Sequence, residues 1–188
     1  MTRKLFIIAI LMMSAMVGHA SNKKGETRKK ADTLSVWKDY FVGNIIFQDK
    51  APESEGSRIY HSIITQPEEY IKEQARAVLN TLYFSPEDSI VPVHNLRYTL
   101  EDSKGISAKG GSNGEIRIFY STRHIASSFQ GNDTAKVAFE TRGVLLHELT
   151  HAYQLEPQGI GNYGNNKVFW AFIEGMADAV RVANGGFK

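Results

Sequence analysis

A histidine–glutamate motif within an apolar stretch places the strongest constraint on how this chain can fold. Residues 144–152 read Val-Leu-Leu-His-Glu-Leu-Thr-His-Ala, so His147 and His151 are four positions apart. On an α-helix this spacing puts both imidazoles on one face, where they can reach the same ion. The apolar neighbours predict a buried helix, and buried imidazoles need partners. The motif therefore predicts a zinc site on a core helix. The alternative is a helix with two ordinary histidines and a surface glutamate.

The glutamate of the motif adds a chemical role to this site. Glu148 directly follows the first histidine, so it can lie beside a metal ion and accept a proton from water. The motif therefore predicts a zinc-dependent hydrolase, with one zinc ion per chain and Glu148 as its general base. A peptide bond is the expected target.

A catalytic zinc site generally has three protein ligands and keeps one position for water. Residues 173–178, near the end of the chain, read Ile-Glu-Gly-Met-Ala-Asp. Glu174 and Asp178 share a helix face at this spacing. We expect Glu174 to be the third ligand and Asp178 to accept the N–H of a ligand histidine. The reverse assignment stays open, as does a solvated face paired with Arg181. Gly175 is expected to let the two helices approach closely.

The first twenty residues have the pattern of a secretory signal peptide. A basic head precedes an apolar run over 5–17, and Gly18-His19-Ala20 offers a cleavage point. We expect an exported protein, secreted or periplasmic, with no stable membrane span after cleavage, because the apolar run is short. An uncleaved N-terminal anchor is the alternative. Residues 21–38 are polar and basic, and we interpret them as a linker.

The charge balance of the remaining chain excludes one large class of partners. The whole chain carries a net charge of +2, but from position 33 onward acidic residues outnumber basic ones by 18 to 15. A slightly acidic domain does not indicate nucleic-acid binding. The chain contains no cysteine, so its stability has to come from the core and from metal instead of disulfides.

Hydrophobic periodicity predicts a single α+β domain over residues 39–188. We expect a small sheet, mostly antiparallel or mixed, packed on the motif helix and the glutamate helix. Strands are predicted at 44–48, 96–100 and 115–121; helices from about 67 to 82, 131 to 154 and 169 to 182; and loops at 109–114 and 155–167.

Two segments together resemble the basic secretory protein family, zinc peptidases of plants and bacteria. They are residues 143–154 around the first motif and residues 172–181 around the glutamate. The pairing of His-Glu-x-x-His with a downstream Glu and Asp also resembles the gluzincin arrangement. The resemblance extends to residues 49–52 and 115–121 and so covers most of the chain after the linker.

The resemblance implies a zincin-like catalytic domain and a protein or peptide substrate. It implies zinc binding by His147, His151 and Glu174, with Glu148 as the base. It also implies that the strand over 115–121 lies along the cleft and pairs with an extended substrate.

Members of this family usually continue beyond the glutamate helix, whereas this chain stops at Lys188. We therefore expect the catalytic domain to be incomplete at its C-terminus. This expectation keeps a second class of function open, a secreted zinc-containing binding module or inactive pseudoenzyme with a fourth protein ligand on the metal. A zinc hydrolase that cleaves an ester or deacylates a glycan is a third possibility.

Overall fold

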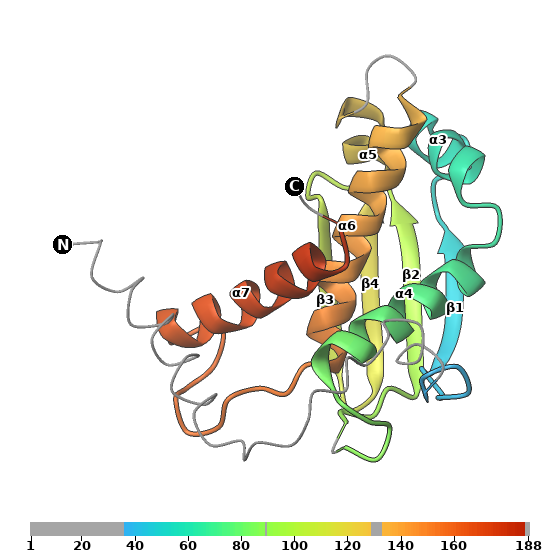
Figure 1. Cartoon of the computed structure of the whole chain (residues 1–188). Helices are drawn as coiled ribbons and strands as arrows, with labels where there is room; N and C mark the ends of the chain where they lie inside the picture. Colours follow the sequence, from blue (N-terminus) through green and yellow to red (C-terminus); the bar gives the residue numbers. More distant parts are fainter. Residues whose placement is uncertain (1–35, 89, 129–132, 187–188) are drawn as a thin grey trace.

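The structure is a computed structural model that describes residues 36–88, 90–128 and 133–186 (Figure 1). The predicted signal peptide and most of the predicted linker fall on residues 1–35, outside the described residues. Trp37, near the end of the predicted linker, is fully buried and belongs to the core. The described elements are β1 (Asn44–Asp49), α3 (Glu55–Ile63), α4 (Pro67–Leu82), β2 (Asn95–Glu101), β3 (Ser107–Ser112), β4 (Glu115–Ser121), α5 (Thr122–Ser128), α6 (Thr134–Tyr153) and α7 (Lys167–Ala183).

The described strands form one four-stranded sheet in the order β1-β2-β4-β3. An α+β fold with a small mixed sheet is therefore confirmed. Of the two arrangements expected, mostly antiparallel or mixed, the sheet has the mixed one: β1–β2 and β2–β4 are parallel and β4–β3 is antiparallel. The physical reason is the crossover through α3 and α4, which returns the chain to the end of the sheet where β1 began.

The edge of the sheet differs from the sequence prediction. Residues 107–112, which largely overlap the predicted loop, form β3 and pair with β4. The connection is a tight turn in which Asn113 and Gly114 have φ values of 53° and 80°, as two-residue hairpins require. β4 therefore lies inside the sheet, with strands on both sides. The expectation that this strand lies along the cleft and pairs with a substrate is wrong. On its other side β3 has no strand partner among the described residues.

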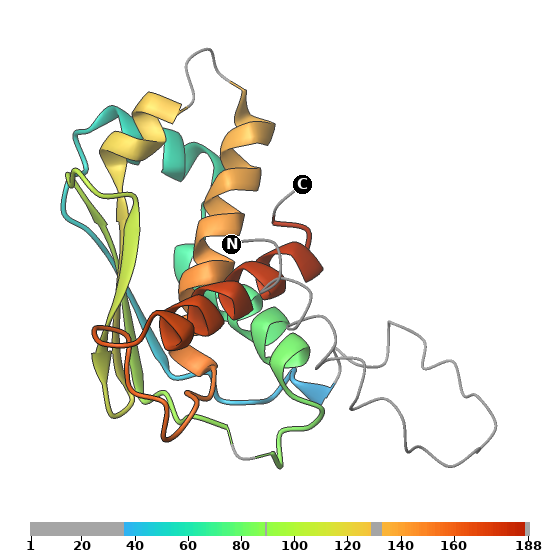
Figure 2. The same ribbon diagram turned by 90° about the vertical axis from the view of Figure 1, so that its left-hand side faces the viewer.

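The helices α4, α6 and α7 lie on one face of the sheet (Figure 2). α6 contacts β3, and α7 runs across α6 (Figure 1). The sequence patterns miss the short helices α3 and α5, which pack against each other at one end of the sheet. Isolated helices of this length are marginal, so their packing has to stabilise them. None of the described helices is both long and apolar enough to span a membrane.

The motif helix is buried, as predicted. Leu145, Leu146 and Leu149 are fully inaccessible to solvent and belong to the main core cluster. They pack in the same cluster as the sheet residues Leu96, Tyr98, Leu100, Ile118 and Tyr120. Burying side chains of this size contributes about 1.5–3 kcal/mol each. The core therefore holds α6 rigidly against the sheet, and with it the two histidines.

Where α6 meets the end of α7, the glycine that permits a close approach is Gly143 of α6. A Cβ atom there would overlap the carbonyl oxygen of Gly186 and approach the guanidinium of Arg181. A Cβ atom at Gly175 would meet no heavy atom of the described residues within 4 Å. The expected role of Gly175 is therefore wrong. Gly175 lies on the exposed face of α7, whereas Gly143 faces the segment that follows α7.

Two Gly→Ala substitutions in helices are expected to have opposite effects on stability. In Gly56→Ala, the new methyl group would overlap the backbone carbonyl of Thr122, where α3 meets α5. We expect a loss of about 1–3 kcal/mol in the free energy of unfolding. In Gly175→Ala, the methyl group enters open space, and we expect a gain of about 0.5–1 kcal/mol. Denaturant unfolding with chelator present would measure both. An unchanged midpoint for Gly56→Ala would contradict the described α3–α5 contact.

Candidate metal centre

The two motif histidines occupy consecutive turns near the end of α6. The helix begins after Asp133, whose side chain accepts a hydrogen bond from the Lys136 amide (3.0 Å), and it ends at Tyr153. These boundaries agree with the sequence prediction. The Nε2 atoms of His147 and His151 are 3.1 Å apart, and the two rings are inclined at 85°. Both Nε2 atoms therefore converge on one point, where they could bind the same ion.

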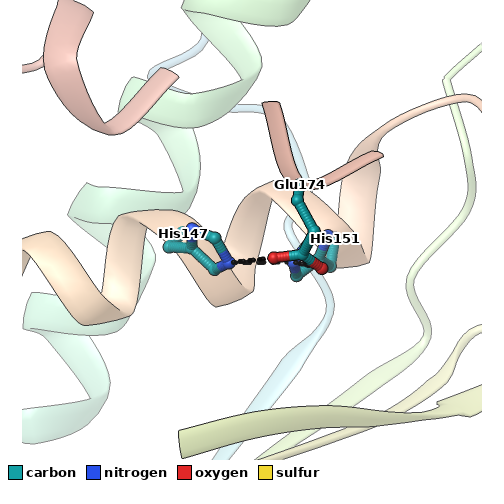
Figure 3. Close-up of side chains that lie close together, drawn as sticks. All are labelled: His147, His151 and Glu174. Carbon is teal, nitrogen blue, oxygen red and sulfur yellow. Dashed lines mark hydrogen bonds and ion pairs between the residues drawn. The ribbon is translucent and has the colours of Figure 1, made fainter. Parts of the chain in front are cut away.

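Helix α7 brings a carboxylate to this point. Its first turn is capped by Asn166, whose side chain accepts hydrogen bonds from the amides of Val168 and Phe169. Two turns further along, the Glu174 carboxylate lies next to both imidazoles (Figure 3). Its Oε2 atom is 3.2 Å from Nε2 of His147, and its Oε1 atom is 3.5 Å from Nε2 of His151. His147, His151 and Glu174 therefore form a group that can bind a metal ion.

The donor set and its spacing fit zinc. Two imidazole nitrogens and one carboxylate oxygen are the ligands of a common type of catalytic zinc site. Ligand atoms about 2.0–2.1 Å from an ion in tetrahedral geometry are separated by about 3.3 Å. The separation of 3.1 Å between the two Nε2 atoms, and that of 3.2 Å between Nε2 of His147 and Oε2 of Glu174, lie close to that value.

Each histidine has a polar partner at its second nitrogen. Nδ1 of His147 lies 3.1 Å from Oδ1 of Asp178. An ionised carboxylate can only accept, so this contact places the proton on Nδ1 and leaves Nε2 free to bind a metal. The structure thus brings Glu174 to the coordinating nitrogens and Asp178 to the opposite side of the His147 ring.

The partner of His151 is Gln154, which the sequence reasoning missed. Its side-chain amide is 2.9 Å from Nδ1 of His151, and its Oε1 atom is buried without a hydrogen-bond partner within the described residues. Turning the amide over directs Oε1 toward Nδ1 and again leaves Nε2 of the histidine for a metal. The sequence does contain a signal for this contact, because Gln154 follows His151 by three positions and so shares a helix face with it.

Burial changes the protonation of two groups in the centre. His151 is largely enclosed, and burial together with the neighbouring His147 lowers its pKa to about 4. The imidazole is therefore neutral at neutral pH, which is the form that binds metal. Burial raises the pKa of the Glu148 carboxyl, while the adjacent His147 acts in the opposite direction.

A cavity of about 520 Å³ opens beside the centre, between the sheet edge and the helices. Its lining includes Ser107, Ala108 and Lys109 of β3, His147, Glu148 and His151 of α6, and Glu156, Tyr163, Ile173 and Glu174 of the loop and α7. A smaller cavity of about 170 Å³ shares Ser107, His147 and Glu148 and reaches Asp178 and Arg181. Glu148 therefore faces the space in which a substrate can meet the metal group.

Tyr163 also reaches the centre and was missed by the sequence reasoning. Its hydroxyl donates a hydrogen bond of 2.6 Å to Oε1 of Glu174. Tyr163 belongs to the segment between α6 and α7, which has no periodicity that could indicate which way a side chain points.

A family model described as "Peptidase of plants and bacteria" (BSP) matches residues 44–188. The chain belongs to the BSP family. The match confirms the resemblance to basic secretory proteins and runs from β1 through α7. All residues of the candidate metal centre, including Gln154 and Tyr163, lie within the BSP match. No curated protein and no solved structure matches the chain.

Proposed function

We propose that this BSP-family chain is an exported, zinc-dependent peptidase with a zincin-like catalytic domain. One zinc ion would be held by His147, His151 and Glu174. The observation that carries the proposal is the position of the Glu174 carboxylate, 3.2 and 3.5 Å from the coordinating nitrogens of the two motif histidines. The family description as peptidases supports the reaction, and the signal-peptide pattern over residues 1–20 supports export.

The chemistry that zinc supplies in such sites is polarisation of the scissile carbonyl and acidification of a water molecule. Glu148 is the group that moves the proton. Its carboxylate faces the cavity and lies next to His147 in the helix, so it can accept a proton from the attacking water and donate it to the leaving amine. Asp178 and Gln154 hold the two imidazoles in the orientation that directs Nε2 toward the cavity.

The free edge of β3 supports a protein or peptide as substrate. Ser107, Ala108 and Lys109 line the same cavity as Glu148, and β3 has no strand partner on that side among the described residues. An extended peptide can add to such an edge through main-chain hydrogen bonds. This arrangement would place a peptide bond beside the metal group, with the substrate running along β3.

Chelation tests the proposal directly. We expect the purified mature protein to contain about one zinc ion per chain by elemental analysis. Cleavage of casein should stop with 1,10-phenanthroline and return when zinc is added, whereas magnesium should not restore it because it prefers oxygen ligands. A folded protein that binds no zinc would contradict the proposal. A protein that binds zinc but cleaves neither casein nor peptides would instead support the binding module.

A further inference from the structure

The segment between α6 and α7 is ordered by its own asparagine side chains. Oδ1 of Asn162 accepts a hydrogen bond from the Gly164 amide (3.0 Å), and Oδ1 of Asn165 accepts one from the Asn162 amide (2.8 Å). Gly161 has a φ of +97°, and a Cβ atom there would lie 2.7 Å from Oδ1 of Asn165. These contacts build a compact turn around Tyr163.

The same turn is joined directly to the helix that carries the metal ligand. Asn166 closes the turn with its amide bonded to the Asn162 carbonyl (3.1 Å), and its side chain caps α7. Glu174 follows two helical turns later. The turn and the cap therefore set the position of Tyr163 relative to Glu174, and the phenol hydroxyl meets Oε1 at 2.6 Å.

This contact distinguishes the two oxygens of Glu174. Oε1 accepts the hydrogen bond from Tyr163 and lies 3.5 Å from Nε2 of His151, whereas Oε2 lies closer to a histidine nitrogen, 3.2 Å from Nε2 of His147. A hydrogen bond from a neutral donor to a carboxylate is among the stronger kinds; it occupies one of the two lone pairs of Oε1 and makes that oxygen a weaker metal ligand than Oε2. Without it, both oxygens could bind the ion and occupy the position that a catalytic site keeps for water.

We propose that Tyr163 is a positioning residue that makes Glu174 a metal ligand through one oxygen. The inference rests on the proposed function and extends it to a residue outside both helical motifs. Tyr163 acts through Glu174. Because its side chain is 52 % exposed, removing the hydroxyl leaves no cavity in the core.

The test compares Tyr163→Phe with Tyr40→Phe in the otherwise unaltered mature protein. Tyr40 packs against Trp37 and is not among the described residues lining either cavity at the metal centre. Zinc affinity is measured without substrate, by competition with a chromophoric chelator. We expect Tyr163→Phe to weaken zinc binding by about 10- to 100-fold, as for other residues that orient a ligand. Tyr40→Phe should bind zinc like the unaltered protein.

The cobalt(II) form supplies a readout that a purely structural role would not move. The visible absorption bands of cobalt(II) lose intensity as its coordination number rises. If a second oxygen of Glu174 binds the ion in Tyr163→Phe, the absorbance of these bands should therefore be lower than in the unaltered protein. Asn165→Ala, which loosens the turn but keeps the phenol, should change affinity and spectrum in the same direction and by less.

Three results would overturn the inference, and they differ from one another. Unchanged zinc affinity and cobalt spectrum in Tyr163→Phe would show that the hydroxyl does not position Glu174. Unchanged metal binding with lost peptidase activity would show that the hydroxyl acts on the substrate instead. Absence of zinc binding by the unaltered, folded protein would contradict the proposed function itself, before any variant is compared.

Discussion

Glu148→Gln is expected to abolish most peptide hydrolysis while leaving zinc bound. The substitution keeps the size of the side chain but removes the group that accepts the proton of the attacking water. General acid–base catalysis of this kind contributes roughly 10²- to 10⁴-fold to the rate, and we expect kcat to fall by that factor. The proposed ligands His147, His151 and Glu174 are unchanged, so zinc content should remain about one per chain.

The measurement pairs steady-state kinetics on a fluorogenic peptide with elemental analysis of the same sample. Glu73→Gln is the matched control, because Glu73 is an exposed glutamate of α4 and loses the same charge. It should retain both zinc and activity. Activity of Glu148→Gln near that of the unaltered protein would exclude Glu148 as the base, and loss of zinc from this variant would point to a structural role.

Glu174→Ala is expected to weaken zinc binding much more than Asp178→Ala. Glu174 lies 3.2 and 3.5 Å from the coordinating nitrogens, whereas Asp178 contacts the far nitrogen of His147. Loss of an orienting partner typically lowers metal affinity by about 10- to 100-fold, which we expect for Asp178→Ala. Loss of a direct ligand should exceed that range. The comparison decides between the two assignments that the sequence leaves open.

Zinc-dependent thermal stabilisation measures this difference for both variants. Binding to the folded state raises stability by RT ln(1 + [Zn]/Kd), so weaker binding gives a smaller shift in Tm at the same zinc concentration. Both changes introduce alanine into α7, which favours a helix, so each variant controls for the other. If Asp178→Ala loses the shift and Glu174→Ala keeps it, Asp178 is the ligand.

Much of the candidate centre was predictable because its signals are local. The four-residue spacing of His147 and His151 puts both on one helix face whatever the rest of the chain does. The same rule places Glu174 and Asp178 together on α7. Apolar neighbours predicted the burial of α6, N-cap residues predicted its start, and the loop-forming composition of residues 155–167 predicted its end. In each case the period of the helix converts sequence spacing directly into spatial proximity.

The edge of the substrate cavity could not be predicted in the same way. β3 has the sequence Ser-Ala-Lys-Gly-Gly-Ser, which lacks the β-branched and aromatic residues typical of strands. It becomes a strand because β4 offers it a pairing partner across a tight turn. The pattern of β4 correctly predicted a strand, but no local pattern shows whether a strand lies inside a sheet or at its edge.

The sequence by itself determined the helix that presents the histidines, the candidate base Glu148 and the two acidic candidates on α7. The tertiary structure alone decided which acidic side chain meets the coordinating nitrogens, which strand borders the cavity, and that Gly143 takes the close contact expected at Gly175. It also brought Gln154 and Tyr163 to the proposed ligands. The physical reason is that helical periodicity acts within a few residues, whereas these contacts depend on the packing of α6, α7 and β3 against one another.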